Sequence, residues 1–315
     1  MSTGAAATSV PPAERATAVS TLAAYAELTK PRIVVLELVA VLAAMHIATG
    51  YGAPGSLWSL PMLAAVAAGV ALVAGSANAI NQWIERERDA IMPRTMGRPL
   101  PSGRVSPDGA LWFSAVTLAL GVSILSTSGG PTATAVALAT WFGYVAVYTP
   151  LKVRTWWNTA IGAVSGATPL WIGWTAGGGS LADPVGLALV ATMYAWQFPH
   201  FMAIAWLCRH DYAKADYRMS TTLDPTGWWA GVQAIVGAAA MLTVSLAPLL
   251  VSARLQASPA AWLSYAVMAS AGAALMLWRS GEFFAQRSDA TARRLMRASL
   301  VYVPWWLLAA WACGV

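Results

Sequence analysis

The sequence predicts an all-α membrane protein whose chain crosses the bilayer nine times. Of its 315 residues, 58% are hydrophobic and only 10% are charged, and the mean hydropathy is +0.58. A typical soluble domain carries about 25% charged residues, so this composition excludes one. The apolar residues are also gathered into long runs, as expected for a bundle of spanning helices.

Nine apolar runs define the predicted elements in chain order. Each is close to the roughly 17 to 25 residues that cross a hydrocarbon core as a helix. The runs cover 33–50, 60–81, 108–125, 133–148, 158–176, 185–208, 228–249, 259–278 and 298–313. The first twenty residues have neither the apolar core nor the basic start of a signal peptide. We therefore expect a disordered tail over 1–20 and a single transmembrane domain over 21–315.

Basic residues are distributed unequally between the loops. If the chain crosses nine times, the basic segments before the first run and after the second, fourth, sixth and eighth runs share one face. The opposite loops hold a single basic residue, Arg254. The positive-inside rule makes the basic face, and the N-terminus, cytoplasmic. Because the basic residues are dispersed among loops, the net charge of +6 does not indicate a nucleic-acid-binding surface.

The seventeen tryptophans and two cysteines suggest no separate site. Most tryptophans fall near the ends of the runs, as in an interfacial aromatic belt. Cys208 and Cys313 are far apart in sequence, which favours neither a disulfide framework nor a zinc site.

The densest polar cluster follows the second run, where residues 78–104 read NAINQWIERERDAIMPRTMGRPLPSGR. If the helix continues to residue 91, Asn81, Glu85 and Asp89 lie at successive steps of four and share one face. Their oxygens are hard ligands suited to Mg²⁺, which commonly shares its shell with phosphate oxygens. Charged residues at a membrane boundary predict a functional site. A solvated loop of alternating charges is the simpler alternative for this segment alone.

A second acidic cluster follows the sixth run, where residues 209–219 read RHDYAKADYRM. Asp211 and Asp216 would lie on the same face of the membrane as the first cluster. We therefore expect one shared site in which Mg²⁺ bridges a diphosphate between the two clusters. Basic and aromatic residues available at this boundary to hold the diphosphate are Arg94, Arg98, Lys152 and Tyr148.

Polar residues within the runs seldom face lipid. Those in this chain are Glu37, His46, Gln197 and His200. His200 follows Pro199, which frees a backbone carbonyl and can open the helix toward a cavity. For both histidines, a ligand contact and a simple hydrogen bond to a neighbouring helix are the alternatives. Glu37 is expected to face the bundle interior.

These blocks, in this order, resemble the UbiA superfamily of intramembrane prenyltransferases, from Leu28 to the C-terminus. The resemblance is carried by LTKPRIVVLEL, by the 78–104 block, by YTPLKVRTWWNTAIGAVSGATPLWIGW, by WQFPHFMAIAW with RHDYAKADYRM, and by ARRLMRASLVY. The first superfamily motif, NDxxDxxxD, matches Asn81, Gln82, Glu85 and Asp89, with Gln82 in place of a carboxylate. Asp211 matches the second motif, whereas the role of Asp216 is not assigned.

The resemblance implies nine transmembrane helices around a central cavity that opens sideways to lipid. The PRTMGRPLPSGR and WQFPHF blocks favour the branch that acts on heme. It transfers the farnesyl group of farnesyl diphosphate to a vinyl group of protoheme IX, giving heme O in the cell inner membrane. Catalytic roles then fall on Asn81, Glu85, Asp89, Lys152 and Asp211, with Asn81, Glu85, Asp89 and Asp211 as ligands of Mg²⁺. His200, His46 and Trp196 become candidates for heme binding. Beyond the substrates and membrane lipid, heme A synthase, the next enzyme of the pathway, is an implied partner.

Two alternatives remain open at this point. A UbiA-type enzyme of the same fold could prenylate a quinone precursor or a chlorophyll-like ring instead of heme. An ion-coupled transporter could use intramembrane acids, but such proteins usually carry inverted repeats and charges near the bilayer midplane. Here nearly all acids gather at one interface, which favours the enzyme.

Overall fold

The computed structural model describes residues 18–49 and 59–315, and every regular element in this part of the chain is helical. The long helices are α2 (Pro31–Thr49), α3 (Leu60–Ile91), α4 (Pro107–Ser128), α5 (Gly130–Phe142), α7 (Asn158–Ala176), α8 (Pro184–Leu207), α11 (Trp228–Ser245), α14 (Pro259–Gln286) and α15 (Asp289–Ala312). The short helices are α1 (Ala18–Leu28), α6 (Thr149–Leu151), α9 (Arg209–Lys214), α10 (Ser220–Leu223), α12 (Pro248–Val251) and α13 (Ala253–Gln256). A π-helical turn, η1 (Gly143–Tyr148), joins α5 to α6.

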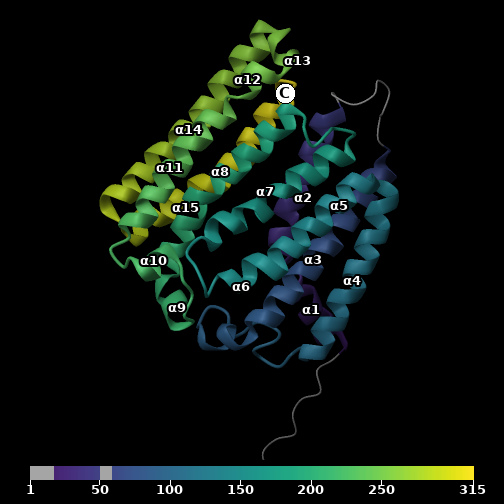
Figure 1. Cartoon of the computed structure of the whole chain (residues 1–315), viewed down its shortest axis with the longest axis vertical. Coiled ribbons are helices and arrows are strands. Elements are labelled where there is room, and N and C mark those ends of the chain that lie inside the picture. Colours follow the sequence, from purple (N-terminus) through teal and green to yellow (C-terminus); the bar gives the residue numbers. More distant parts are fainter. Residues whose placement is uncertain (1–17, 50–58) are drawn as a thin grey trace, which may run out of the picture.

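The predicted all-α, polytopic fold is confirmed (Figure 1). Each of the nine apolar runs contains most or all of one long helix within the described residues; the fourth run also includes η1, and the seventh extends into α12. Residues 1–17 of the predicted tail lie outside the described part of the chain, and α1 begins at Ala18, inside the range predicted as tail.

Helix starts follow local sequence signals. Ser59, Ser106, Asp183 and Ser258 each cap a long helix by accepting a hydrogen bond from a backbone N–H of its first turn, and each is followed by a proline in the first two helical positions. A side-chain oxygen at the cap satisfies an N–H that has no partner within the helix. Proline at that position has no N–H to satisfy. The short polar segments between the apolar runs therefore define where these spans begin.

Within the described residues, eight segments are long and apolar enough to cross a bilayer, and α7 is the long helix that falls outside this set. It carries several polar residues, among them Asn158, Ser165, Thr168 and Thr175, and most of its residues are buried. Figure 1 shows α7 between α5 and α8, and it packs on both and on α2. A helix enclosed by protein need not be apolar all round, because lipid does not contact it.

Close contact between α2 and α7 depends on two glycines one helical turn apart. A Cβ atom on Gly173 would overlap the backbone carbonyl of Val41, and one on Gly177 would overlap that of Met45. Small residues at such spacing allow membrane helices to approach closely. This contact fixes α2 against the centre of the bundle.

Gly173→Ala is therefore expected to destabilise the protein by about 1–3 kcal/mol, because the added methyl group overpacks the α2–α7 contact. Thermal unfolding in detergent measures the effect. Gly281→Ala on α14 is the matched control, since nothing lies within 4 Å of the position its Cβ would take. Equal midpoints for the two variants would contradict the packing argument.

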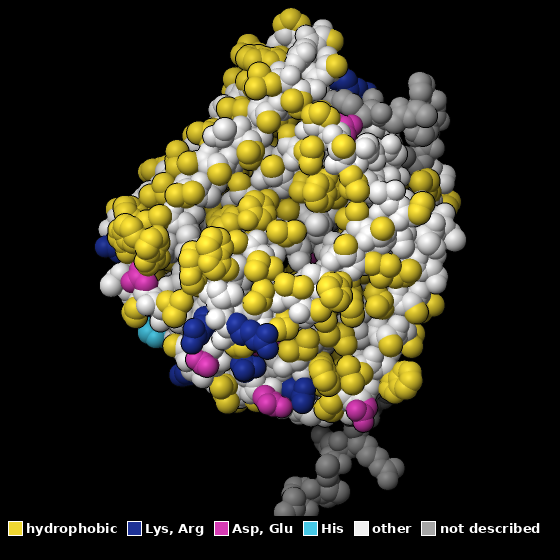
Figure 2. Space-filling view, viewed as in Figure 1, with side chains coloured by type: hydrophobic (Ala, Val, Ile, Leu, Met, Phe, Trp, Pro, Cys, Tyr) yellow, Lys and Arg dark blue, Asp and Glu magenta, His cyan; other side chains and the backbone are white. Residues whose placement is uncertain are grey.

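The remaining helices form two groups beside α2 and α7. Helices α8, α11, α14 and α15 pack on one another around the largest hydrophobic core, and α3, α4 and α5 form the other group. Most charged side chains on the face in Figure 2 lie at the end of the molecule that holds α6, α9 and the α3–α4 loop, whereas hydrophobic side chains cover the middle. The basic segments predicted to share one face thus lie at one end of the bundle.

Three tryptophans near this end occupy positions expected of an interfacial aromatic belt. Trp156, Trp228 and Trp229 are all at least 40% exposed and line an outward groove of about 570 Å³. Amphipathic rings at this level are typical of a membrane–water interface.

Candidate active site

The site is built on the last turns of α3. The predicted face is present: Asn81, Glu85 and Asp89 lie on the helix before it ends at Ile91, and all three are buried. We call these three residues the acidic face. A buried carboxylate is costly unless it is paired. The surroundings of the acidic face therefore decide what it can do.

Three cations from three separate segments contact the acidic face. The Nζ atom of Lys152 lies 2.7 Å from Oε1 of Glu85, and Nη1 of Arg98 lies 2.7 Å from Oδ2 of Asp89. Lys30, between α1 and α2, donates a hydrogen bond of 2.8 Å from Nζ to Oδ1 of Asn81. The predicted cations Lys152 and Arg98 are thus brought to the predicted acids, and Lys30 joins them.

The π-helical turn η1 helps to bring Lys152 to the acidic face. Thr149 donates a hydrogen bond to the carbonyl of Tyr144 and accepts one from Nδ2 of Asn81, which ties this segment to α3. Tyr148 packs against Gly162, where a Cβ would overlap its ring. The Lys152 ammonium lies 4.7 Å from the centre of the Tyr148 ring. The aromatic face is therefore already oriented toward a cation.

The ionisation of the two lysines reflects this crowding. Burial, together with Arg98 and Lys152, lowers the pKa of Lys30 to about 7. Burial alone would also lower the pKa of Lys152, but the neighbouring Glu85 carboxylate outweighs it and raises that pKa well above its ordinary value. Lys152 is thus a fixed positive charge, whereas Lys30 gives up its proton more readily.

The second acidic cluster meets the first through the α3–α4 loop. Asp211 on α9 lies 4.0 Å from Nε of Arg94, so the loop that follows the acidic face contacts α9. A small hydrophobic cluster of Met92, Ala215, Tyr217 and Met219 joins the same segments. Asp216 is exposed at a left-handed turn with φ of 56° and makes no ion pair among the described residues. The structure brings Asp211, but not Asp216, into contact with a residue of the first cluster.

Oxygen atoms at the site remain available for a ligand. Within the described residues, Oδ1 of Asp89, Oε1 of Gln82 and the hydroxyl of Tyr217 are buried without a hydrogen-bond partner. Such atoms are rare in folded proteins and call for an explanation. No three His, Cys, Asp or Glu side chains of the described chain are close enough to hold a metal by themselves. Two carboxylates and an amide suit Mg²⁺, which takes few protein ligands and completes its shell with water and phosphate oxygens.

Two residues of the site were missed by sequence reasoning. Lys30 was counted only as a topological charge, although its place directly before Pro31 put it at the membrane boundary. Tyr217 is 4% exposed, and burial followed by the Glu85 carboxylate raises its pKa far above the ordinary value. Nothing in the spacing of the sequence places Tyr217 beside α3, because that proximity arises only from the packing of distant helices.

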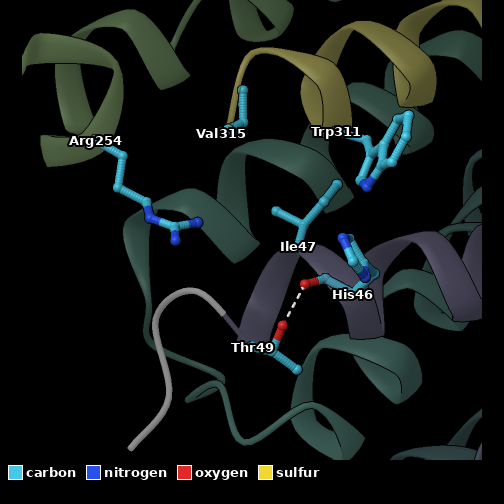
Figure 3. A pocket seen from close by; sticks show the side chains of 7 residues that line it. His46, Ile47, Thr49, Arg254, Trp311 and Val315 are labelled. Atoms are coloured by element: carbon cyan, nitrogen blue, oxygen red, sulfur yellow. Dashed lines mark hydrogen bonds between the residues drawn. The ribbon is translucent and has the colours of Figure 1, made fainter. Parts of the chain in front are cut away.

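The candidates for heme binding separate into two places. Trp196 and His200 lie one turn apart on α8 and pack against α15. His46 lies 16 residues along the chain from Lys30, which corresponds to about 24 Å along a helix. His46 lines a hollow of about 210 Å³ together with Trp311 and Arg254 (Figure 3). This hollow therefore lies toward the opposite end of α2 from Lys30. The structure does not bring His46 to the site.

Comparison with known proteins assigns the chain to a family. The sequence pattern of the UbiA prenyltransferase family matches residues 18–311. The chain belongs to the UbiA prenyltransferase family. The family predicted from the sequence blocks is therefore confirmed, and the transporter alternative has no support.

Relatives of this UbiA-family chain include proteins with a named activity. A protein of Rhodopirellula baltica named protoheme IX farnesyltransferase is 42% identical over 278 residues, covering 88% of this chain and 95% of that protein. A protein of the same name from Solibacter usitatus is 38% identical over 299 residues, covering 89% and 94%.

Solved structures share the UbiA fold at low identity. One of digeranylgeranylglyceryl phosphate synthase has a TM-score of 0.71 at 16% identity and covers 93% of this chain and 98% of that one. One of a UbiA homologue from Archaeoglobus fulgidus bound to GPP and Mg²⁺ has a TM-score of 0.62 at 15% identity and covers 91% and 99%. These likenesses establish the fold of this multi-pass membrane protein.

Proposed function

We propose that this UbiA-family protein transfers the farnesyl group of farnesyl diphosphate to a vinyl group of protoheme IX, giving heme O. The observation that carries the proposal is the buried acidic face surrounded by Lys30, Arg98 and Lys152. Such a site suits a diphosphate held with a divalent cation. The acceptor is supported by the relatives named protoheme IX farnesyltransferase.

Different residues at the acidic face would bind the metal ion and the phosphate oxygens of farnesyl diphosphate. Asn81, Glu85 and Asp89, with Asp211 as a further proposed ligand, would hold Mg²⁺. Of their oxygens, the buried Oδ1 of Asp89 has no hydrogen-bond partner among the described residues, which is consistent with that role. Bound Mg²⁺ neutralises charge on the diphosphate and so improves it as a leaving group. Arg98 and Lys152, with Lys30 and the more exposed Arg94, would bind the remaining phosphate oxygens.

The transfer itself follows from this charge arrangement. The bond between C1 of the farnesyl group and the diphosphate oxygen breaks, and its electron pair leaves with the diphosphate. The π electrons of the heme vinyl group then form a carbon–carbon bond to C1. Water adds to the cation left beside the tetrapyrrole ring and loses a proton, giving the hydroxyethylfarnesyl side chain. The ring of Tyr148, which lies beside Lys152, is proposed to stabilise the allylic cation once the diphosphate draws the Lys152 ammonium toward its oxygens.

The membrane location follows from the substrates and the charge distribution. Both substrates are largely apolar and are supplied from the bilayer. We infer that the acidic face and the N-terminus lie on the cytoplasmic side of the cell inner membrane, because the basic loops share that end. The product is equally apolar, so its consumer, heme A synthase, is proposed as a partner in the same membrane.

The proposal is tested by mass spectrometry of tetrapyrroles formed when the detergent-purified protein is incubated with reduced protoheme IX, farnesyl diphosphate and Mg²⁺. We expect a heme that has gained one farnesyl group and one water, and we expect it to be absent when EDTA removes the metal. If diphosphate is released only with a quinone precursor or a chlorophyll-like ring, the prenyltransferase activity is supported and protoheme IX is rejected as the acceptor. No diphosphate release with any acceptor would reject the prenyltransferase activity.

A further inference from the structure

The hydrogen bonds around His200 favour one tautomer of its imidazole ring. Nδ1 of His200 lies 2.7 Å from the hydroxyl oxygen of Ser299 on α15. That hydroxyl donates its single hydrogen to the carbonyl of Met296 at 2.6 Å. In this arrangement the hydroxyl accepts from His200, which favours the tautomer with its proton on Nδ1 and a bare lone pair on Nε2.

A second proton on this imidazole is unfavourable. The imidazolium would place a charge within a membrane span, which is costly unless it is paired. No carboxylate of the described chain forms an ion pair with His200. The neutral Nδ1–H tautomer is thus the form that this environment supports.

The same serine also holds the plane of the ring. The indole Nε1–H of Trp196 donates a hydrogen bond of 2.9 Å to the backbone carbonyl of Ser299. Its ring stacks on the imidazole with centroids 4.7 Å apart and planes 17° apart. Both side chains of α8 are therefore fixed on one residue of α15, and the direction of Nε2 is fixed with them.

Nε2 itself has no hydrogen-bond partner among the described residues. It is also not fully enclosed by the protein, so a ligand can reach it. A bare lone pair can bind a metal ion, but it cannot donate a hydrogen bond to a propionate. This tautomer therefore favours ligation of the heme iron by His200 over a hydrogen bond from Nε2 to a heme propionate.

The depth of His200 also suits a substrate shared with the acidic face. His200 precedes the end of α8 at Leu207 by seven residues, or about 10 Å along the helix. Glu85 precedes the end of α3 at Ile91 by six residues, or about 9 Å. Both helices end at the charged end of the bundle, so the two side chains leave their helices at similar depths.

We propose that Nε2 of His200 is an axial ligand of the iron in the heme acceptor, and that Ser299 is a positioning residue that fixes the imidazole tautomer and ring. This inference rests on the proposed function. Ligation forms a coordinate bond from the Nε2 lone pair and releases no proton, because the proton on Nδ1 stays in its hydrogen bond to Ser299. The iron bond would hold the flat ring so that one vinyl group faces the donor.

The test is spectroscopic and does not depend on turnover. The full chain in detergent is titrated with ferric protoheme IX, and axial ligation is followed by visible absorption and electron paramagnetic resonance. We expect the wild type to show a nitrogen ligand that is lost in His200→Ala and restored by added imidazole. Ser299→Ala should weaken heme binding about 10- to 100-fold, as is common when a group that orients a metal ligand is removed. Ser299→Thr, which keeps the hydroxyl, should bind as the wild type does.

His210→Ala is the matched control, because His210 is exposed on α9 at the same end of the bundle. An unchanged spectrum in His200→Ala, or a nitrogen ligand lost instead in His210→Ala or His46→Ala, would overturn the inference. If the protein forms farnesylated heme but the heme spectrum is the same in wild type and His200→Ala, His200 is not the iron ligand and the proposed function still holds. A wild type that binds no heme and farnesylates none would reject both.

Discussion

Glu85→Gln is expected to lower the rate of farnesyl transfer by at least about 100-fold, the size of effect seen when one preorganised electrostatic contact is removed from an active site. Glutamine keeps an oxygen that can accept the hydrogen bond from Lys152, so the side chain can stay in place. It removes the negative charge that would hold Mg²⁺ beside the diphosphate. The loss should therefore appear in the rate per folded protein and should not be rescued by excess donor.

The measurement is diphosphate release and product formation by protein that elutes as a single species in size-exclusion chromatography. Glu87→Gln is the matched control: it makes the same change two residues away, where the side chain is 84% exposed and pairs with Arg86. If Glu85→Gln and Glu87→Gln have equal transfer rates, the acidic face does not take part in the reaction.

Lys152→Met is expected to affect both folding and activity. The pair with Glu85 is almost completely buried, with side-chain exposures of 11% and 8%. Removing one partner of a buried ion pair typically costs about 3–5 kcal/mol, because an uncompensated charge remains. The same substitution removes a cation from the proposed diphosphate site. Thermal unfolding in detergent and the transfer rate should both fall.

The double variant Lys152→Met/Glu85→Gln separates the two effects. It leaves no unpaired charge at this position, so we expect most of the lost stability to return while transfer stays low. The coupling energy from the double-mutant cycle measures the pair. Lys214→Met on the exposed surface of α9 is the control for loss of a lysine. Additive losses in the double variant would show that the two side chains do not depend on each other.

The sequence predicts the spans and the acidic face well, because both depend on short-range rules. Bilayer thickness sets the length of a span, and helical periodicity places Asn81, Glu85 and Asp89 on one face. Contacts between distant segments follow no such rule. Lys30 and Tyr217 reach the acidic face through packing, and His46 is separated from it because it lies at the far end of α2.

The surroundings of α7 and the π-helical turn η1 could not be predicted, because the local sequence of each segment does not reveal them. Helix α7 fits the length of a span but is more polar than the others, since its surroundings are protein. The π-helical turn η1 has no composition that distinguishes it from the α-helix around it. The roles given to His200, Trp196 and the metal ligands remain predictions; His200→Ala tests the first, and Glu85→Gln tests one of the metal ligands.

The π-helical turn η1 constrains how this protein can evolve. In an α-helix each residue advances the chain by about 100° around the axis, and a π-helical turn accommodates one residue more than an α-helical turn. A descendant that lost one residue between Gly143 and Tyr148 could keep every side chain named above and still rotate Lys152 away from α3. Selection therefore acts on the length of this segment as well as on its residues, and an alignment that opens a gap here would compare lysines that point in different directions.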